Sequence, residues 1–449
     1  MATMTRISLR TVVSTMPVQL GRLYPLSVLD RLMENHHIRI VHYYKSLRGT
    51  TTTEVASRMR ETIMETLMCF PIMTGRLVRS EEDRKWMIKC NDCGVRIVES
   101  SAQGSVESWL QSVDQEKELQ LAFWEDMHSE PYYCATFYVQ ITAFEEGGLA
   151  LGLSCSHLLA DPISSSLFLK SWADVSLTGK VLGPPFFYPL PQRRPINTSP
   201  AHKSSTHLIN RYRSIKQSLN PSPNLIPIQK FKTITLSFTE QMVQACIDLA
   251  KVHDDTPAGP SPSPFQALVG LLWACISKAK GMTDGLMDVS ICVDTRKVLG
   301  LDKGFFGNCM VYSKLHGENI DVTNISQAAK ATGDAMSTMD NNSVIDLIEW
   351  LEENDDQMSP PASMDGHDLV FVNLESVDAY SVVFGQCEEP LRVSCYVTPV
   401  NAKGKVVVLP SPGAEGPLSR VAMVTLPEDE AARLCEDPLI SKFSRTLNV

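Results

Sequence analysis

The sequence predicts a two-domain α/β protein whose mixed β-sheets are flanked by helices. Its 449 residues exceed what one ordinary hydrophobic core holds. With 43% hydrophobic and 20% charged residues, the chain has the composition of a soluble globular protein. Helical and strand periodicities alternate through both halves without a tandem repeat. We therefore expect a first domain over residues 1–178, a connection over 179–231 and a second domain over 232–449.

In the first half, a helix and several short strands are expected. Apolar residues recur at helical spacing over 55–67, and the pattern stops before Phe70-Pro71, as at the end of an amphipathic helix. Alternating or short apolar runs predict strands at 86–88, 95–98, 137–142 and 149–156.

The expected connection contains no acidic residue between Asp174 and Glu240. Proline and serine are frequent in it, and one or two helical turns are expected at 208–215. Two interpretations stay open, a solvated linker and a basic crossover that attracts a phosphorylated ligand. The cations of this stretch are Lys180, Arg193, Arg194, Lys203, Arg211, Arg213, Lys216, Lys230 and Lys232.

The second half repeats the alternation of strands and helices. Strands are expected at 231–238, 287–293, 406–409 and 422–426. Helices are expected at 239–253, 265–278 and 325–339, with a Pro/Gly/Ser-rich loop at 256–264.

One motif stands at the junction of an expected strand and an expected helix. His157 and Asp161 follow the apolar stretch 149–156, and Pro162 then opens an amphipathic run. Asp161 is therefore expected to be an N-cap and Pro162 the first helical residue. His157, at the end of the strand, is free to face a cavity. An isolated His-x-x-x-Asp pattern also occurs by chance, so a purely structural histidine is the alternative.

Composition excludes several other classes of protein. A net charge of −10 disfavours nucleic acid as a partner. The start of the chain lacks an apolar signal core and no apolar run predicts a membrane span, so the cytoplasm is expected. The twelve cysteines have no repeated spacing, which indicates buried thiols in a reducing compartment, and no metal site is expected. Cys90 and Cys93, the one close pair, are expected to be free thiols in a loop.

Nucleophilic catalysis by the chain itself is not expected. The sequence has no Gly-x-Ser-x-Gly elbow, and Cys155 precedes His157 on the same expected strand. A neutral histidine near pH 7 suits the role of general base for an attacking hydroxyl.

Motifs along the whole chain resemble those of the BAHD acyltransferases of plants. They are Leu26-Ser27-Val28-Leu29-Asp30, Phe70-Pro71-Ile72-Met73-Thr74-Gly75-Arg76-Leu77, His157 with Asp161, Pro264-Phe265-Gln266-Ala267-Leu268 with Trp273, Val293-Asp294-Thr295-Arg296, Phe305-Phe306-Gly307-Asn308, and Leu409-Pro410-Ser411. The resemblance implies a chloramphenicol-acetyltransferase-like fold of two similar domains with a solvent channel between them. It further implies a monomer that uses a coenzyme A thioester as substrate, needs no bound cofactor, and has His157 as its catalytic base.

The chain departs from the family at the second signature. Asp-Phe-Gly-Trp-Gly is replaced by Val383-Phe384-Gly385-Gln386-Cys387, and the preceding Thr-Ser-Trp by Val372-Asn373-Leu374. In the family, the aspartate pairs with an arginine, for which Arg296 is the candidate, so Val383 removes that ion pair. The resemblance implies CoA-binding residues Ser263, Lys230 and Arg213, and substrate-pocket residues His37, Ile38, Asn373 and Phe384.

Segments 10–15, 25–31 and 383–387 resemble the coumarin synthase branch of the family. That resemblance implies an enzyme of phenylpropanoid metabolism that closes ortho-hydroxycinnamoyl-CoA to a coumarin such as scopoletin and releases CoA. Two alternatives stay open. One is intermolecular O-acyl transfer to an alcohol or amine. The other is a non-catalytic partner of very-long-chain fatty-acid elongation in wax synthesis.

Overall fold

The computed structural model describes residues 4–45, 52–127, 131–192, 206–217, 230–251, 261–355, 364, 366, 368–385, 387–401 and 403–448. The chain forms two compact units. The first contains Met1–Pro189, Asp302–Asn308 and Val377–Pro399, and the second contains Leu190–Leu301, Cys309–Ser376 and Val400–Val449. The predicted α/β class with mixed sheets is confirmed, but the units differ from the expected contiguous boundaries because two later segments join the first unit.

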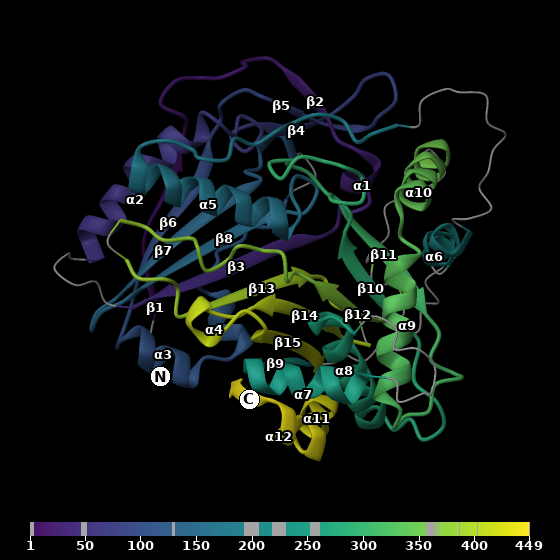
Figure 1. The fold of residues 1–449 in the computed structure, drawn as a ribbon. Helices are drawn as coiled ribbons and strands as arrows, with labels where there is room; N and C mark the ends of the chain where they lie inside the picture. Colours follow the sequence, from purple (N-terminus) through teal and green to yellow (C-terminus); the bar gives the residue numbers. More distant parts are fainter. Residues whose placement is uncertain are drawn as a thin grey trace. The chain divides into compact units, whose positions relative to one another are not determined.

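A six-stranded mixed sheet forms the centre of the first unit (Figure 1). Its strand order is β1 (Met4–Val12), β6 (Val95–Ala102), β7 (Phe137–Phe144), β8 (Leu149–Ser156), β3 (His37–Tyr44) and β13 (Arg392–Thr398). The β6–β7 pair is parallel and the other pairs are antiparallel. Every residue of β8 is buried, which requires cover on both faces of the sheet.

Helices and a short sheet complete the first unit. Two long helices, α2 (Thr52–Leu67) and α5 (Pro162–Thr178), are joined by the Trp172 indole, which donates to Met59 O at 3.1 Å. An apolar cluster of the first unit contains Trp109 of α3 (Val106–Ser112). Gly152 of β8 is required because a Cβ there would lie 2.0 Å from Leu121 O. The remaining elements are α1 (Val28–Arg31), α4 (Gln115–Leu119), the 3₁₀ turn Pro131–Tyr133, and a sheet of β2 (Leu23–Pro25), β5 (Trp86–Lys89) and β4 (Arg76–Arg79).

β13 explains why residues 377–399 belong to the first unit. It pairs with β3 along its whole length, from Arg392 opposite Tyr43 to Thr398 opposite His37. The Ser394 hydroxyl also donates to the buried Glu118 carboxylate at 2.8 Å. The backbone ladder and this buried hydrogen bond together fix a late segment to an early sheet.

The second unit is built on a seven-stranded sheet. Its order is β11 (Met310–Leu315), β10 (Val289–Asp294), β12 (Leu369–Asn373), β14 (Lys405–Pro410), β15 (Arg420–Pro427), β9 (Phe231–Phe238) and β16 (Arg445–Asn448). The pairs β10–β12 and β12–β14 are parallel, and the others are antiparallel. The helices are α6 (Thr206–Gln217), α7 (Glu240–Ala250), α8 (Pro264–Ala279), α9 (Ile325–Ser337), α10 (Asn341–Glu353), α11 (Glu428–Cys435) and α12 (Pro438–Phe443), and a 3₁₀ turn spans Gly413–Glu415.

Candidate active site

The His-x-x-x-Asp motif lies where β8 ends and α5 begins. β8 stops at Ser156, and Asp161 is the N-cap residue of α5. The Ser164 backbone N–H donates to Asp161 Oδ1 at 2.8 Å, which satisfies one of the unpaired amides at the helix start. Pro162 is the first helical residue. Asp161 is fully buried and its carboxylate acts on the helix, so it positions the corner.

The backbone of His157 is fixed on both sides. Its N–H donates to His36 O at 2.9 Å, and its carbonyl accepts from Asn308 Nδ2 at 2.7 Å. Asn308 also donates its backbone N–H, at 2.9 Å, and Nδ2, at 2.8 Å, to Asp30 Oδ1. The side chain of His157 is only 3% exposed. Sequence reasoning placed Asp30 and Asn308 in motifs but gave them no role, because 278 residues separate them.

The segment that carries Asn308 is tied to α5 by a second contact. Ser164 Oγ donates to Gly307 O at 2.9 Å, and the Gly307 N–H donates to Ser164 Oγ at 3.0 Å. Gly307 has φ +153, a backbone conformation that side chains rarely adopt. The glycine therefore allows the segment 305–308 to approach the corner closely and present Asn308.

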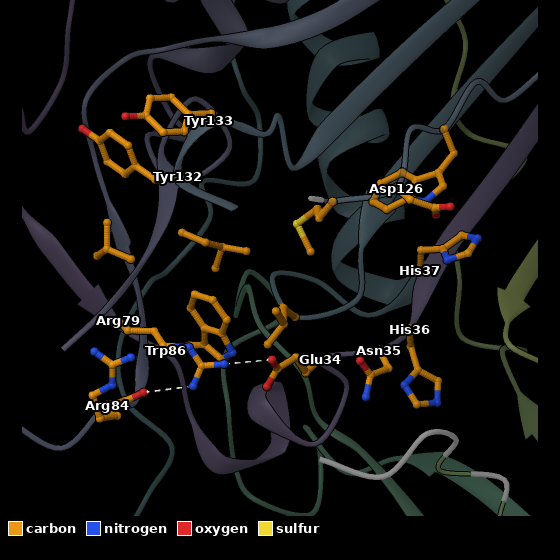
Figure 2. A pocket seen from close by; sticks show the side chains of 15 residues that line it. Glu34, Asn35, His36, His37, Arg79, Arg84, Trp86, Asp126, Tyr132 and Tyr133 are labelled. Atoms are coloured by element: carbon orange, nitrogen blue, oxygen red, sulfur yellow. Dashed lines mark hydrogen bonds and ion pairs between the residues drawn. The ribbon is translucent and has the colours of Figure 1, made fainter. Parts of the chain in front are cut away.

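A pocket of about 800 Å³ lies beside this corner (Figure 2). His36, His37 and Leu158 form the part nearest the motif. Its remaining walls combine aromatic, aliphatic and charged groups, which are Trp86, Trp124, Tyr132, Tyr133, Leu77, Val78, Met127, Glu34, Asn35, Arg79, Arg84 and Asp126. The Arg79 guanidinium lies over the Trp86 ring, 4.0 Å from its centroid, and pairs with Glu34 at 3.1 Å. The pocket can therefore hold a planar ring while hydrogen-bonding its polar substituents.

His37 is a neutral group of this pocket. Burial, followed by the nearby Arg39 guanidinium, lowers the pKa of His37 to about 4. Its ring stacks on Trp124 with 5.0 Å between centroids. Its Nε2 lies 2.6 Å from Thr398 Oγ1 and 3.5 Å from Arg39 Nη2. Because a guanidinium can only donate, Nε2 is an acceptor and the imidazole proton is placed on Nδ1.

The other expected pocket residues lie elsewhere. Ile38 is fully buried in β3, and it does not line the described pocket. Phe384 is also fully buried and packs edge-on against Trp172, at 4.9 Å, and Tyr44, at 6.3 Å. Asn373 ends β12 in the second unit, where its side chain accepts from the Glu375 N–H. Of the four, the structure brings only His37 to the pocket of the first unit.

The expected CoA-binding residues all belong to the second unit. Ser263 is the N-cap of α8, where its hydroxyl and the Gln266 side chain form a reciprocal capping box. Arg213 is exposed on α6, 5.6 Å from the Trp350 ring centroid. Lys230 is exposed immediately before β9. These two cations are open to solvent, as a contact with phosphate requires.

Arg296 and Val383 show the consequence of the altered second signature. Arg296 forms an ion pair with Asp294 at 2.8 Å, two residues before it in the chain. Val383 carries no charge and offers no carboxylate to an arginine. Gln386, the fourth residue of the altered signature, lies outside the described residues.

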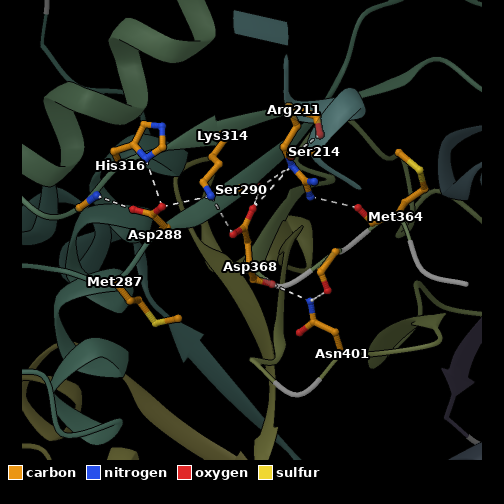
Figure 3. A network of polar contacts seen from close by, with 12 residues as sticks. Arg211, Ser214, Met287, Asp288, Ser290, Lys314, His316, Met364, Asp368 and Asn401 are labelled. Atoms are coloured by element: carbon orange, nitrogen blue, oxygen red, sulfur yellow. Dashed lines mark hydrogen bonds and ion pairs between the residues drawn. The ribbon is translucent and has the colours of Figure 1, made fainter. Parts of the chain in front are cut away.

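One cation of the basic crossover has a structural role (Figure 3). Arg211 of α6 is buried, and its Nε donates to Ser290 Oγ at 2.9 Å while Nη2 donates to Met364 O at 3.1 Å. Ser290 Oγ in turn donates to Asp368 Oδ2 at 2.8 Å. Lys314 also pairs with Asp368, at 3.4 Å. Arg211 therefore anchors α6 to β10. Arg193, Arg194 and Lys203 lie outside the described residues.

Other candidate chemistries find little support in the described part of the chain. Burial raises the pKa of the Cys155 thiol to about 12, so this thiol is protonated at neutral pH and is a poor nucleophile. Among the described residues, no group of three His, Cys, Asp or Glu side chains could hold a metal ion. No helix described for this chain is both long and apolar enough to cross a membrane.

Comparison with known proteins identifies the family. The model of the Transferase family matches residues 2–438, so the chain belongs to this family, that of the BAHD acyltransferases. These enzymes use acyl-CoA as a substrate and no bound cofactor.

Relatives extend over most of the chain. The Arabidopsis thaliana protein ECERIFERUM 26-like is 28% identical over 428 residues, covering 95% of this chain and 93% of the relative. Rosmarinate synthase of Plectranthus scutellarioides is 27% identical over 404 residues, covering 88% and 90%. Among solved structures, vinorine synthase aligns with a TM-score of 0.70 at 18% identity and covers 96% of both chains. The F. sporotrichioides TRI101 complex with coenzyme A and T-2 aligns with a TM-score of 0.70 at 14% identity, covering 95% and 100%.

Proposed function

We propose that the protein transfers an acyl group from a CoA thioester to a hydroxyl group, with His157 as the general base. The observation that carries this proposal is the placement of His157. Hydrogen bonds of its backbone to His36 and Asn308 fix its position at the strand-to-helix corner, and the adjacent residues His36 and Leu158 line a pocket of about 800 Å³. Membership of an acyl-CoA-dependent family supports the same chemistry.

The reaction needs one proton-transfer group and no covalent enzyme intermediate. The imidazole of His157 accepts the hydroxyl proton as the oxygen attacks the thioester carbonyl carbon. Collapse of the tetrahedral intermediate breaks the C–S bond, and the imidazolium returns the proton to the CoA sulfur. Asp161 acts through the helix start, where it caps α5. Ser263, Lys230 and Arg213 are the proposed CoA contacts of the second unit.

For the acyl group, we propose a hydroxycinnamoyl thioester. The pocket beside the corner combines tryptophan and tyrosine rings with arginine, glutamate and histidine side chains. Such walls suit a phenolic ring better than a long alkyl chain, because a phenol brings polar substituents to the polar part of the wall, whereas an alkyl chain would bury polar groups against hydrocarbon. Rosmarinate synthase and hydroxycinnamoyltransferase 1 of Oryza sativa subsp. japonica are relatives that are each 27% identical to this chain.

For the attacking hydroxyl, we propose the ortho hydroxyl of the same substrate, which gives a coumarin such as scopoletin. The altered second signature at 383–387 supports this choice, because ring closure needs no pocket for a separate acceptor. The alkene must first become cis, since a trans double bond holds the hydroxyl away from the carbonyl. Proximity then lowers the barrier by on the order of 7 kcal/mol or more.

The test is CoA release from 2-hydroxylated feruloyl-CoA without an added acceptor. We expect scopoletin and CoA in equal amounts, and no CoA release from feruloyl-CoA, which lacks the ortho hydroxyl. CoA release that requires an added alcohol or amine would instead establish intermolecular O-acyl transfer.

A second candidate is a non-catalytic partner of very-long-chain fatty-acid elongation in wax synthesis. Two observations favour it. The ECERIFERUM relatives match 95–96% of the chain under names that state no reaction, and the second signature is altered. Co-expression in yeast with a plant elongase condensing enzyme separates the two candidates. Longer acyl chains that persist with the His157→Ala variant would favour the partner role.

A further inference from the structure

Exposed apolar side chains concentrate near the start of the chain. Sixteen large apolar side chains of the described residues are exposed, and six of them lie between Ile7 and Leu23. Within residues 13–23, here called the apolar loop, Met16 is 61% exposed, Leu20 62% and Leu23 48%. Three exposed apolar side chains within one short surface segment suit contact with an apolar partner.

The backbone of the apolar loop is held in one conformation. The Thr15 N–H donates to Met64 O at 3.2 Å, and the Gly21 N–H donates to Cys90 O at 2.8 Å. The Cys90 N–H donates back to Arg22 O at 2.9 Å. Because the main chain is anchored to α2 and to the start of the 90–94 turn, the exposed side chains are presented without a large ordering cost on binding.

The charge of the apolar loop itself favours an anionic partner, because Arg22 is the one charged residue among residues 13–23. The chain carries −10 overall, but its first 29 residues contain Arg6, Arg10 and Arg22 and no Asp or Glu. The Arg22 guanidinium lies 4.5 Å from the Tyr24 ring centroid. One carboxylate, that of Asp92, contacts the loop by accepting the Ser14 N–H. Leucine and methionine beside arginine and tyrosine is a composition typical of a bilayer interface.

Strand addition by another chain fits the same region less well. β1 is the outer strand of its sheet (Figure 1), so one of its edges is available for pairing. However, the register shifts between Arg6 and Ser8, which makes Ile7 a bulge. Bulges and charged side chains at an outer strand discourage pairing with another strand.

We infer that the apolar loop docks on the surface of an anionic lipid bilayer, with Met16, Leu20 and Leu23 entering the headgroup region and Arg22 contacting lipid phosphates. Docking of this kind is peripheral and requires no spanning helix. The inference does not depend on the proposed acyl transfer.

Vesicle co-sedimentation of the full-length protein tests the inference. We expect binding to phosphatidylcholine vesicles that contain phosphatidylserine, weaker binding to pure phosphatidylcholine, and weakening by salt. The triple variant Met16→Ser, Leu20→Ser, Leu23→Ser should bind about tenfold or more weakly, because three apolar contacts are lost. The matched control Leu177→Ser, Leu182→Ser, Leu249→Ser removes leucines of comparable exposure and should bind as the parent does.

Each alternative outcome has a distinct meaning. Equal binding by the parent and the Met16/Leu20/Leu23 variant would overturn the inference, as would no binding by the parent. Concentration-dependent dimers that the variant abolishes, without vesicle binding, would instead identify the loop as a contact between two copies. Circular dichroism of the variant confirms that it is folded, so loss of binding is not loss of structure.

Discussion

The groups that fix His157 come from three parts of the sequence, residues 30–36, 157–164 and 307–308. His36, Asp30, Ser164 and Asn308 fix the motif through hydrogen bonds to backbone or side-chain atoms. The sequence alone placed His157 and Asp161 at a strand-to-helix junction, because a strand pattern, a capping residue and a proline follow one another locally. It could not assign Asp30 and Asn308, because their contact depends on the tertiary fold.

Replacing Asp161 tests its role as a cap. Asp161→Ala should lower the free energy of unfolding by about 1–2 kcal/mol, measured by urea denaturation, because the Ser164 amide loses its acceptor. It should also reduce turnover, since the start of α5 positions the corner. The control Asp340→Ala removes another N-cap with the same 2.8 Å bond, to the Ser343 amide, and should lower stability without reducing turnover. An Asp161→Ala protein as stable as the parent would contradict this role.

The half-buried His37 and the buried His42 predict how stability depends on pH. Burial is the largest cause that lowers the pKa of both His37 and His42 to about 4, from an ordinary value of 6.5. The unfolded chain therefore binds more protons between pH 4 and 6.5, so stability falls as the pH falls through this window. Each histidine contributes at most roughly 3 kcal/mol. Urea unfolding should show a shallower fall for His37→Gln than for the parent; identical slopes would exclude His37 as a source.

At the scale of elements, the hydrophobic periodicity of the sequence predicted the helices and strands that have a regular apolar pattern of their own. The predicted strand at 231–238 coincides with β9, and the predicted helix at 265–278 lies within α8. β3 was missed because its buried positions include the polar His42, which interrupts the apolar pattern. β13 follows the altered signature at 383–387, and it was missed because its partner β3 lies about 350 residues earlier in the chain. α10 was missed although its sequence is amphipathic.

Two arginines of α6 have different roles, one structural and one proposed to be electrostatic. Arg211 is buried beside Ser290 and Asp368, whereas Arg213 is exposed. Arg211→Ala should lower the free energy of unfolding by about 2–4 kcal/mol, because two buried hydrogen bonds are lost, although Lys314 still pairs with Asp368. Arg213→Ala should change stability by less than about 0.5 kcal/mol. Thermal unfolding of the two variants provides the measurement, and equal losses would contradict the assignment.

The same helix tests the proposed contact with CoA. Arg213→Glu should raise the Michaelis constant for the thioester, because a repulsive charge replaces an attractive one near the CoA phosphates. Added salt should raise the parent's constant in the same direction, since screening limits these charges to about 8 Å at physiological ionic strength. A Michaelis constant that changes neither with Arg213→Glu nor with salt would favour the alternative interpretation of residues 179–231 as a solvated linker.

At the scale of the whole molecule, the order of motifs identified the fold class and the family, but not the division of the chain into units. Residues 302–308 and 377–399 leave the expected second domain because Asn308 and β13 complete the first unit. No pattern in the nearby sequence predicts that a late segment of the chain belongs to the first unit. The sequence predicts the family more specifically than the reaction, because the chain keeps His157 but changes the second signature.

Single-turnover CoA release is the measurement that tests the central claim, catalysis by His157, most directly. With the enzyme in excess over 2-hydroxylated feruloyl-CoA and at saturating concentration, the parent should release CoA faster than buffer, and His157→Ala should be slower than the parent by roughly 10²–10⁴-fold. His157→Ala should remain folded, as circular dichroism can check, because the backbone contacts of residue 157 do not use its side chain. Equal rates of CoA release by the parent and His157→Ala would contradict the role of His157 as the base.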